Sequence, residues 1–204
     1  MRQTLFFLAA FGVQLALALA ALGLITLLDW AHGLKADKAA VGMLLAGCGT
    51  GAGYLLRIRG QEPGAVWAAY SILAVYMTVC VITDFQTCKI YNFLQLPAAA
   101  AGAALCLLHS PPPESGAGLI VFALLQSLLF GRMYGAGDVM VFQICGLYLV
   151  AGGGGFQTLL LHMALAVGIL GGVQAVKRNI NKRGNLKEPV PFVPYIAVSL
   201  LWFL

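Results

Sequence analysis

The stretch AVWAAYSILAVYMTVCVITD, residues 65–84, decides the fold of this chain, because an uncharged apolar run ends there in an aspartate. A run of this length is typical of a transmembrane helix, which needs about 20 apolar residues to cross roughly 30 Å of hydrocarbon. An aspartate at the centre of such a helix costs about 2.5–3.5 kcal/mol on insertion scales, so acidic residues in membrane spans are functional candidates. Asp84 is therefore the first candidate residue.

The composition extends this interpretation to the whole chain. Hydrophobic residues make up 61% of its 204 positions and charged residues 9%, which excludes a water-soluble domain. The 25 glycines suit close packing of helices in lipid, where small residues let backbones approach. The sequence has no basic patch interleaved with aromatic residues, so nucleic acid is not an expected partner.

Eight apolar runs are separated by polar segments. They cover residues 4–28, 39–56, 65–83, 93–108, 117–131, 138–151, 156–176 and 195–204. The sequence therefore predicts an all-α, polytopic membrane protein with about eight transmembrane helices. The second run holds two overlapping G-x-x-x-G pairs within residues 47–53, which suit tight helix packing. The three prolines at 111–113 predict a loop over residues 109–116, since proline cannot continue a helix.

The distribution of basic residues predicts the orientation of the chain. If the spans alternate in direction, the loops at 29–38, 84–92, 132–137 and 177–188 share one side of the membrane. That side carries nine basic residues: Lys35, Lys38, Lys89, Arg132, Lys177, Arg178, Lys182, Arg183 and Lys187. The other side carries three: Arg2, Arg57 and Arg59. By the positive-inside rule the first side is cytoplasmic, so both termini are expected outside.

A second aspartate ends the segment Gly135-Ala136-Gly137-Asp138, at the start of the sixth run. In the predicted topology Asp84 and Asp138 lie on the same, cytoplasmic side of the membrane. Two carboxyl groups that share one proton can hydrolyse a peptide bond by acid–base catalysis. The sequence therefore predicts an aspartate dyad at the membrane face.

The helix dipole predicts different roles for the two carboxyl groups. We expect Asp84 to close its helix and Asp138 to open one, and the dipole disfavours negative charge at the first position and favours it at the second. Close carboxylates do not both ionise cheaply. We therefore expect a coupled pair in which Asp84 more often holds the proton and Asp138 activates water. Lys89 would favour an ionised Asp84 and weaken that preference.

The glycines before Asp138 have an expected role of their own. Because they lack Cβ, Gly135 and Gly137 allow backbone angles that are strained for other residues, and they let an extended substrate strand approach closely. The alternative is that each aspartate caps a helix at the lipid boundary. Asn92 has the same two interpretations, a hydrogen bond near the dyad or a cap on the fourth helix.

Cysteines and histidines show no metal-binding pattern. The five cysteines form no C-x-x-C motif and lie mostly in apolar runs, and the three histidines are scattered. We expect neither a metal nor another cofactor. His162 lies inside an apolar run, which predicts a hydrogen-bonded histidine between helices.

Three segments together resemble a known family. They are Asp84 with Lys89-Ile90-Tyr91-Asn92, the Gly135–Asp138 segment, and Pro191-Phe192-Val193-Pro194-Tyr195. With them the chain resembles the type IV prepilin peptidases, the membrane-embedded GxGD aspartic proteases, and more closely their short forms. The resemblance covers residues 65–204 as a six-helix peptidase core. It assigns no role to residues 1–64, which we expect to form two N-terminal transmembrane helices.

The resemblance implies an activity, partners and site residues. It implies removal of a short, positively charged leader from pilin-like precursors at the cytoplasmic face of the inner membrane, by an aspartic endopeptidase without a cofactor. The implied partners are the precursor, the lipid bilayer and secretion or pilus assembly machinery. The catalytic residues would be Asp84 and Asp138, with Gly135, Gly137, Lys89 and Asn92 as substrate-binding or supporting residues.

The chain departs from the family pattern at three points. Tyr91 stands where family members commonly have proline, and Met140 stands where they commonly have lysine. The long family members carry an insert with paired C-x-x-C zinc motifs and also methylate the new N-terminus; this chain has no such insert. Methyltransferase activity is therefore not expected.

Two other classes of function fit the same residues. In a transporter or channel, Asp84 and Asp138 would line a proton or cation path, since intramembrane carboxylates and glycine-broken helices occur there too. In a non-catalytic membrane scaffold, the charged residues would only flank the spans. Against transport, both acids are expected at one face and no internal repeat is visible.

Overall fold

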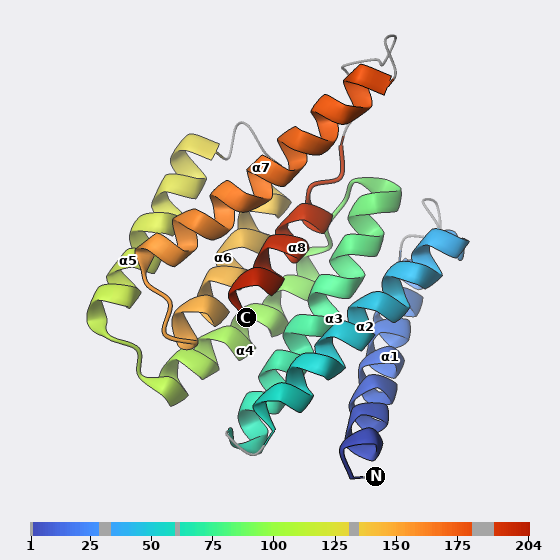
Figure 1. Cartoon of the computed structure of the whole chain (residues 1–204), viewed down its shortest axis with the longest axis horizontal. Coiled ribbons are helices and arrows are strands. Elements are labelled where there is room, and N and C mark those ends of the chain that lie inside the picture. The colour runs from blue at the N-terminus through green and yellow to red at the C-terminus, as the bar shows by residue number, and fades with distance from the viewer. Residues whose placement is uncertain (1, 29–33, 60–61, 131–134, 181–189) are drawn as a thin grey trace. The chain divides into compact units, whose positions relative to one another are not determined.

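The computed structural model in Figure 1 describes residues 2–28, 34–59, 62–130, 135–180 and 190–204. Within these ranges every element is helical and no strand occurs, which confirms the all-α part of the prediction. The helices are α1 (Arg2–Leu28), α2 (Lys38–Ile58), α3 (Gly64–Thr87), α4 (Asn92–His109), α5 (Pro113–Leu125), α6 (Ala136–Ala151), α7 (Phe156–Ile180) and α8 (Val193–Phe203). A π-helical turn, η2 (Gln126–Phe130), continues α5.

Several of these helices are long and apolar enough to cross a membrane. Of the described residues, five helices meet both conditions: α1, α2, α3, α4 and the part of α7 up to Lys177. The helices α5, α6 and α8 are apolar but shorter. The chain therefore has the helices of a membrane protein, as the sequence predicts.

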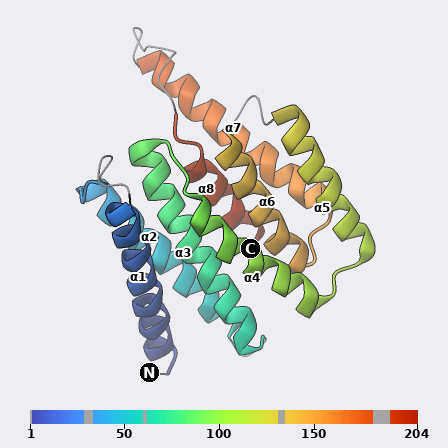
Figure 2. The ribbon, with the colours of Figure 1, turned by 180° about the vertical axis from the view of Figure 1, so that it is seen from behind.

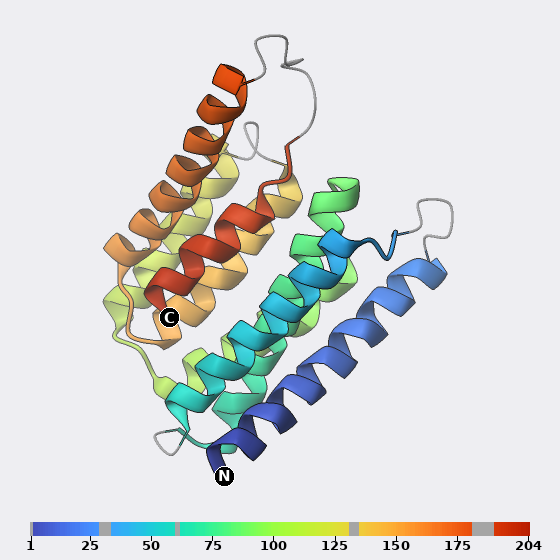
Figure 3. The ribbon, with the colours of Figure 1, turned by 45° about the vertical axis from the view of Figure 1, so that its right-hand side comes forward.

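The chain forms two compact units, Met1–Leu105 and Cys106–Leu204. The boundary that the motifs predict after residue 64 lies inside the first unit. In that unit α1, α2 and α3 pack against one another, as Figure 3 shows. Because α3 contributes most of the buried side chains here, it forms the centre of the three-helix bundle.

One of the two G-x-x-x-G pairs of α2 makes the predicted close packing. A Cβ atom at Gly47 would overlap the side chain of Thr78 on α3, and one at Gly51 would lie 2.5 Å from Ala74 Cβ and from Gln14 Oε1. Gly49 and Gly53 have no such neighbour within 4 Å. The pair at 47 and 51 is therefore the packing seam, and the pair at 49 and 53 is not.

The second unit is built around α6, which packs against α5, α7 and α8 and is visible from behind in Figure 2. Phe142 on α6 is fully buried, and its ring meets Phe192 edge-on at 5.6 Å between centroids and His162 at 5.4 Å. These contacts join the entry of α8 and the second turn of α7 to the first half of α6. Edge-to-face pairs of this kind add about 0.5–1.5 kcal/mol beyond the apolar area that they bury.

Besides the end of α7, which lies at Ile180 instead of residue 176, helix ends differ clearly from the prediction at two places. The loop expected over residues 109–116 is shorter, since α4 continues to His109 and α5 already begins at Pro113. Proline is well suited to the first position of a helix, because its fixed φ is helical and its missing N–H has no partner to lose there. The other difference concerns the end of α3 and therefore the candidate site.

Candidate active site

Asp84 lies in the last turn of α3 and does not end the helix as predicted. The helix continues to Thr87, and Cys88 caps it in a left-handed conformation with φ of 52°. The Cys88 N–H donates to the Asp84 carbonyl oxygen at 2.9 Å, which closes the helix. Asp84 is only 5% exposed. The interpretation of Asp84 as a simple helix cap is therefore wrong, since the residue is buried inside a helix.

The hydroxyl groups of the two threonines near Asp84 find their partners within α3 itself. Thr87 Oγ1 donates to the Thr83 carbonyl oxygen at 2.7 Å, and Thr83 Oγ1 donates to the Cys80 carbonyl oxygen at 3.2 Å. Both bonds remain within α3, so these polar side chains need no partner outside the helix. A threonine-rich end can thus stay helical in apolar surroundings.

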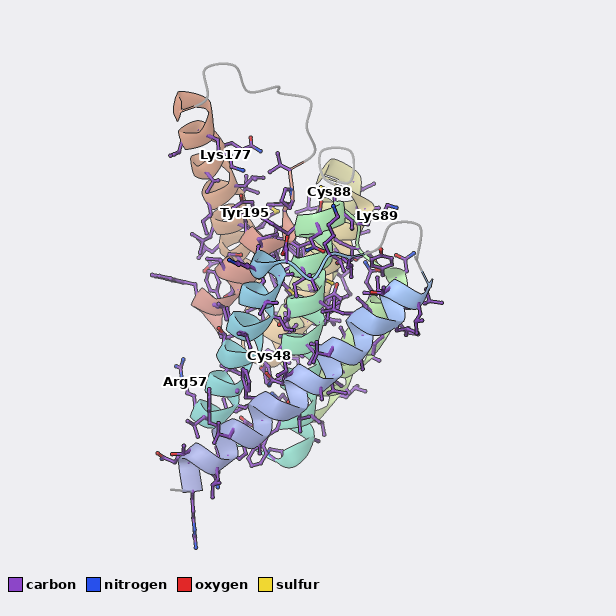
Figure 4. The ribbon with its side chains drawn as sticks, turned by 90° about the vertical axis from the view of Figure 1, so that its right-hand side faces the viewer. Cys48, Arg57, Cys88, Lys89, Lys177 and Tyr195 are labelled. Atoms are coloured by element: carbon purple, nitrogen blue, oxygen red, sulfur yellow. The ribbon has the colours of Figure 1, made fainter. Side chains whose placement is uncertain are left out.

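Lys89 and Asn92 follow Asp84 on the short connection to α4. Lys89 is exposed on the non-helical segment, and Asn92 is the exposed first residue of α4. The Tyr91 carbonyl oxygen accepts the Leu94 N–H at 3.1 Å and so begins the hydrogen bonding of α4. Figure 4 shows Cys88 and Lys89 at one end of the first unit and Arg57 at the opposite end.

Asp138 is the third residue of α6, as predicted for a residue that opens a helix. Its carboxylate oxygen Oδ2 accepts the backbone N–H of Gly135 at 3.2 Å, while its own N–H donates to the Gly135 carbonyl oxygen at 3.0 Å. The side chain therefore caps the helix start from inside the first turn. Its charge also lies at the positive end of the helix dipole, where a carboxylate is favoured.

The two glycines before Asp138 adopt ordinary backbone conformations. Gly135 has φ of −64° and ψ of 150°, and Gly137 lies inside the first turn of α6. The expectation that these positions need angles forbidden to other residues is therefore wrong. A Cβ at Gly135 would lie 3.4 Å from Asp138 Oδ2, an ordinary contact. Close approach of a substrate strand stays the prediction that would explain both glycines.

The candidate residues fall into two groups. Asp84, Lys89 and Asn92 lie together in the first unit, at the end of α3 and the start of α4. Gly135, Gly137 and Asp138 form a single helix start in the second unit. Each group provides one carboxyl group in a defined environment.

One contact beside Asp84 could not be foreseen. The side chain of Gln86, two residues further along α3, makes two hydrogen bonds to the backbone of Lys35 before α2. The partners are 51 positions apart in the chain. Because every residue type has the same backbone groups, the sequence does not indicate which residue a side chain will bind through its backbone.

Within the described ranges, no group of three or more His, Cys, Asp or Glu side chains could hold a metal ion. No family model, no curated protein and no solved structure matches the chain. Its function must therefore be inferred from its own residues.

Proposed function

We propose that this chain is a membrane-embedded aspartic endopeptidase of the type IV prepilin peptidase kind, in its short form. It removes the leader of a pilin-like precursor at the cytoplasmic face of the inner membrane. Asp84 and Asp138 are its catalytic residues. The motifs at 84–92, 135–138 and 191–195 support the assignment to this family.

The burial of Asp84 is the observation that carries the proposal. Among the acidic residues that the structure describes, Asp84 alone is buried. Asp37, by contrast, is exposed and caps α2 by accepting the Ala40 N–H at 2.7 Å. A carboxyl group taken out of water is costly when ionised, and it is retained in a membrane helix mainly where it has a function.

The environments of the two aspartates suit an acid and a base. Asp84, buried near the negative end of a helix dipole, is suited to hold the proton, and Asp138, at a helix start, is suited to stay ionised. Asp138 would take a proton from water as the water oxygen attacks the scissile carbonyl carbon. Asp84 would give its proton to the carbonyl oxygen. When the tetrahedral diol collapses, the C–N bond breaks and the amine leaves with the proton that Asp138 accepted. One hydroxyl group of the diol returns a proton to Asp84 as the new carboxyl group forms.

The charge pattern supports placing both aspartates at one membrane face. With eight alternating spans, the C-terminal end of α3 and the N-terminal end of α6 lie on the same side, which carries nine of the twelve basic residues. The positive-inside rule makes that side cytoplasmic and places both termini outside. Exposed Lys89 and Lys177 belong to this side. Figure 4 shows Lys177 on α7 and Tyr195 on α8 toward the same end of their unit.

Leader cleavage in membranes tests the proposal. The wild type or a variant is co-expressed with a pilin-like precursor, and removal of the leader is followed by mass spectrometry of the precursor. We expect Asp84→Asn and Asp138→Asn each to lower the cleavage rate by about 10²–10⁴-fold, the usual contribution of acid–base catalysis. Asp37→Asn, a matched change at an exposed helix cap, should cleave like the wild type.

The same variants separate the peptidase from a transporter. If wild type and both Asn variants leave precursors uncut, the peptidase proposal is wrong. A proton or cation path would then show as a flux into proteoliposomes that either Asn variant abolishes.

A further inference from the structure

Gln86 fixes the backbone of Lys35 from both sides. Its Oε1 accepts the Lys35 N–H at 3.2 Å, and its Nε2 donates to the Lys35 carbonyl oxygen at 2.7 Å. One side-chain amide thus satisfies both backbone groups of a single residue in the connection between α1 and α2. Such a pair restrains that backbone as a neighbouring strand would, although no sheet is present in this part of the molecule.

The restraint continues into the start of α2. The Lys35 carbonyl oxygen also accepts the Asp37 N–H at 2.9 Å, and the Asp37 carboxylate accepts the Ala40 N–H at 2.7 Å. A continuous chain of hydrogen bonds therefore runs from the last turn of α3, through Lys35 and Asp37, to the first turn of α2.

The hairpin of α1 and α2 is also fastened to α3 elsewhere. The glycine seam at 47 and 51 lets α2 pack closely on the middle of α3. At the far end, the Arg59 guanidinium lies 4.5 Å above the Phe6 ring and donates to the Arg2 carbonyl oxygen, while Phe6 meets Trp67 edge-on at 5.3 Å. The hairpin is thus attached to α3 along its whole length.

Asp84 lies in the same helical turn as Gln86. We propose that the α1–α2 hairpin, which no motif explains, serves to hold the end of α3 that carries Asp84, and that Gln86 is its positioning residue. This inference deepens the proposed peptidase function and rests on it. The first 64 residues would then contribute to catalysis without touching the substrate.

Limited trypsin digestion in detergent micelles tests the attachment itself. Trypsin cuts after lysine only where the backbone can leave its folded conformation, so the bond between Lys35 and Ala36 should be protected. Gln86→Met, nearly equal in size but without hydrogen bonds, should raise the cleavage rate at this bond about tenfold. The bond after Lys177, on α7 in the other unit, is an internal control and should not change. Gln157→Met, the same change at an exposed position on α7, should leave both bonds unchanged.

Thiol labelling tests whether the attachment reaches Asp84. In a background with the five native cysteines replaced by serine, Asp84→Cys is labelled with a maleimide with and without Gln86→Met. We expect the second change to raise the labelling rate at position 84 by about fivefold or more. This measurement needs no peptidase activity, so it holds even if the wild type cleaves no precursor and the proposed function fails.

Leader cleavage then shows what the position of Asp84 contributes. Gln86→Met should lower kcat by about tenfold and leave KM within about twofold, because the variant displaces the acid and leaves substrate binding intact. Gln86→Glu retains the acceptor for the Lys35 N–H and should give an intermediate kcat. An unchanged trypsin pattern would overturn the attachment. The positioning role would be overturned if Gln86→Met speeds cleavage after Lys35 but leaves the labelling rate at position 84 unchanged. It would also be overturned if an active enzyme with this change keeps the kcat of the wild type.

Discussion

The Nδ1 atom of His162 on α7 lies 2.8 Å from the Ser199 hydroxyl oxygen on α8, and both side chains are fully buried. Ser199 Oγ also donates to the Ile196 carbonyl oxygen at 2.9 Å. A hydroxyl group has one hydrogen to give, and the bond to Ile196 uses it, so we assign the imidazole as the donor, from Nδ1 to Ser199. The predicted interhelical histidine is thereby confirmed, with Ser199 as its partner.

Removal of the Ser199 hydroxyl should destabilise the second unit. Ser199→Ala leaves the His162 Nδ1–H buried without an acceptor, which costs about 1–3 kcal/mol. Adding His162→Phe removes the stranded donor, so the double variant should lose less than the two single variants together. Unfolding in mixed micelles titrated with dodecyl sulfate measures these differences. Thr50→Ala is the control, because that exposed hydroxyl bonds only to Ala46 in its own helix. Strict additivity would contradict the assigned bond.

The seam between α2 and α3 predicts opposite outcomes for two glycines in the same helix. Gly47→Ala places a methyl group against Thr78, whose hydroxyl is held by a 2.7 Å bond to the Ala74 carbonyl oxygen. Overpacking of this kind costs about 1–3 kcal/mol. Gly49→Ala points into open space and should stabilise the fold by about 0.5–1 kcal/mol, because alanine loses less backbone entropy than glycine in a helix. The same micelle titration compares the two variants, and equal effects would show that the seam is misassigned.

The cap at the start of α6 allows stability and catalysis to be separated at Asp138. Asp138→Asn keeps a side-chain oxygen that can accept the Gly135 N–H, so the folded unit should be nearly as stable as the wild type. Asp138→Ala removes the acceptor and should cost about 0.5–2 kcal/mol of stability. Both variants should lose leader cleavage, because neither has a carboxylate to activate water. If Asp138→Asn cleaves like the wild type, Asp138 is only a helix cap.

Much of the fold could be predicted from the sequence, because long uncharged runs have few alternatives to a helix in lipid. The end of α3 could not be predicted, because Asp84 and the polar residues after it are typical of a loop. The helix instead continues to Thr87 and is capped by Cys88, a residue type that rarely adopts φ of 52°. The start of α5 at Pro113 could not be predicted either, because proline occurs both in the loops that end helices and at the first position of a helix.

The candidate site was predictable only where the chemistry is local. Asp138 reaches back to Gly135 within one turn, so the sequence contains both partners and their spacing. The hydrogen bonds between Gln86 and Lys35 join residues far apart in the chain, and no sequence pattern predicts them. The π-helical turn at Gln126–Phe130 is likewise without a sequence signal. Contacts that depend on how helices meet must be seen in three dimensions.

The central claim is that the Asp84 and Asp138 carboxyl groups meet, and disulfide formation tests it most directly. Asp84→Cys and Asp138→Cys are combined in a background with the five native cysteines replaced by serine, and an oxidant is added to membranes. Trypsin then cuts after Lys89, between the two positions. Asp84→Cys with Glu114→Cys, at the start of α5, is the control pair.

We predict that the fragments of the first pair stay joined until they are reduced, and that those of the control pair separate. If a maleimide labels positions 84 and 138 in the same membranes but the fragments always separate, the two carboxyl groups do not meet, and the proposed catalytic dyad is contradicted.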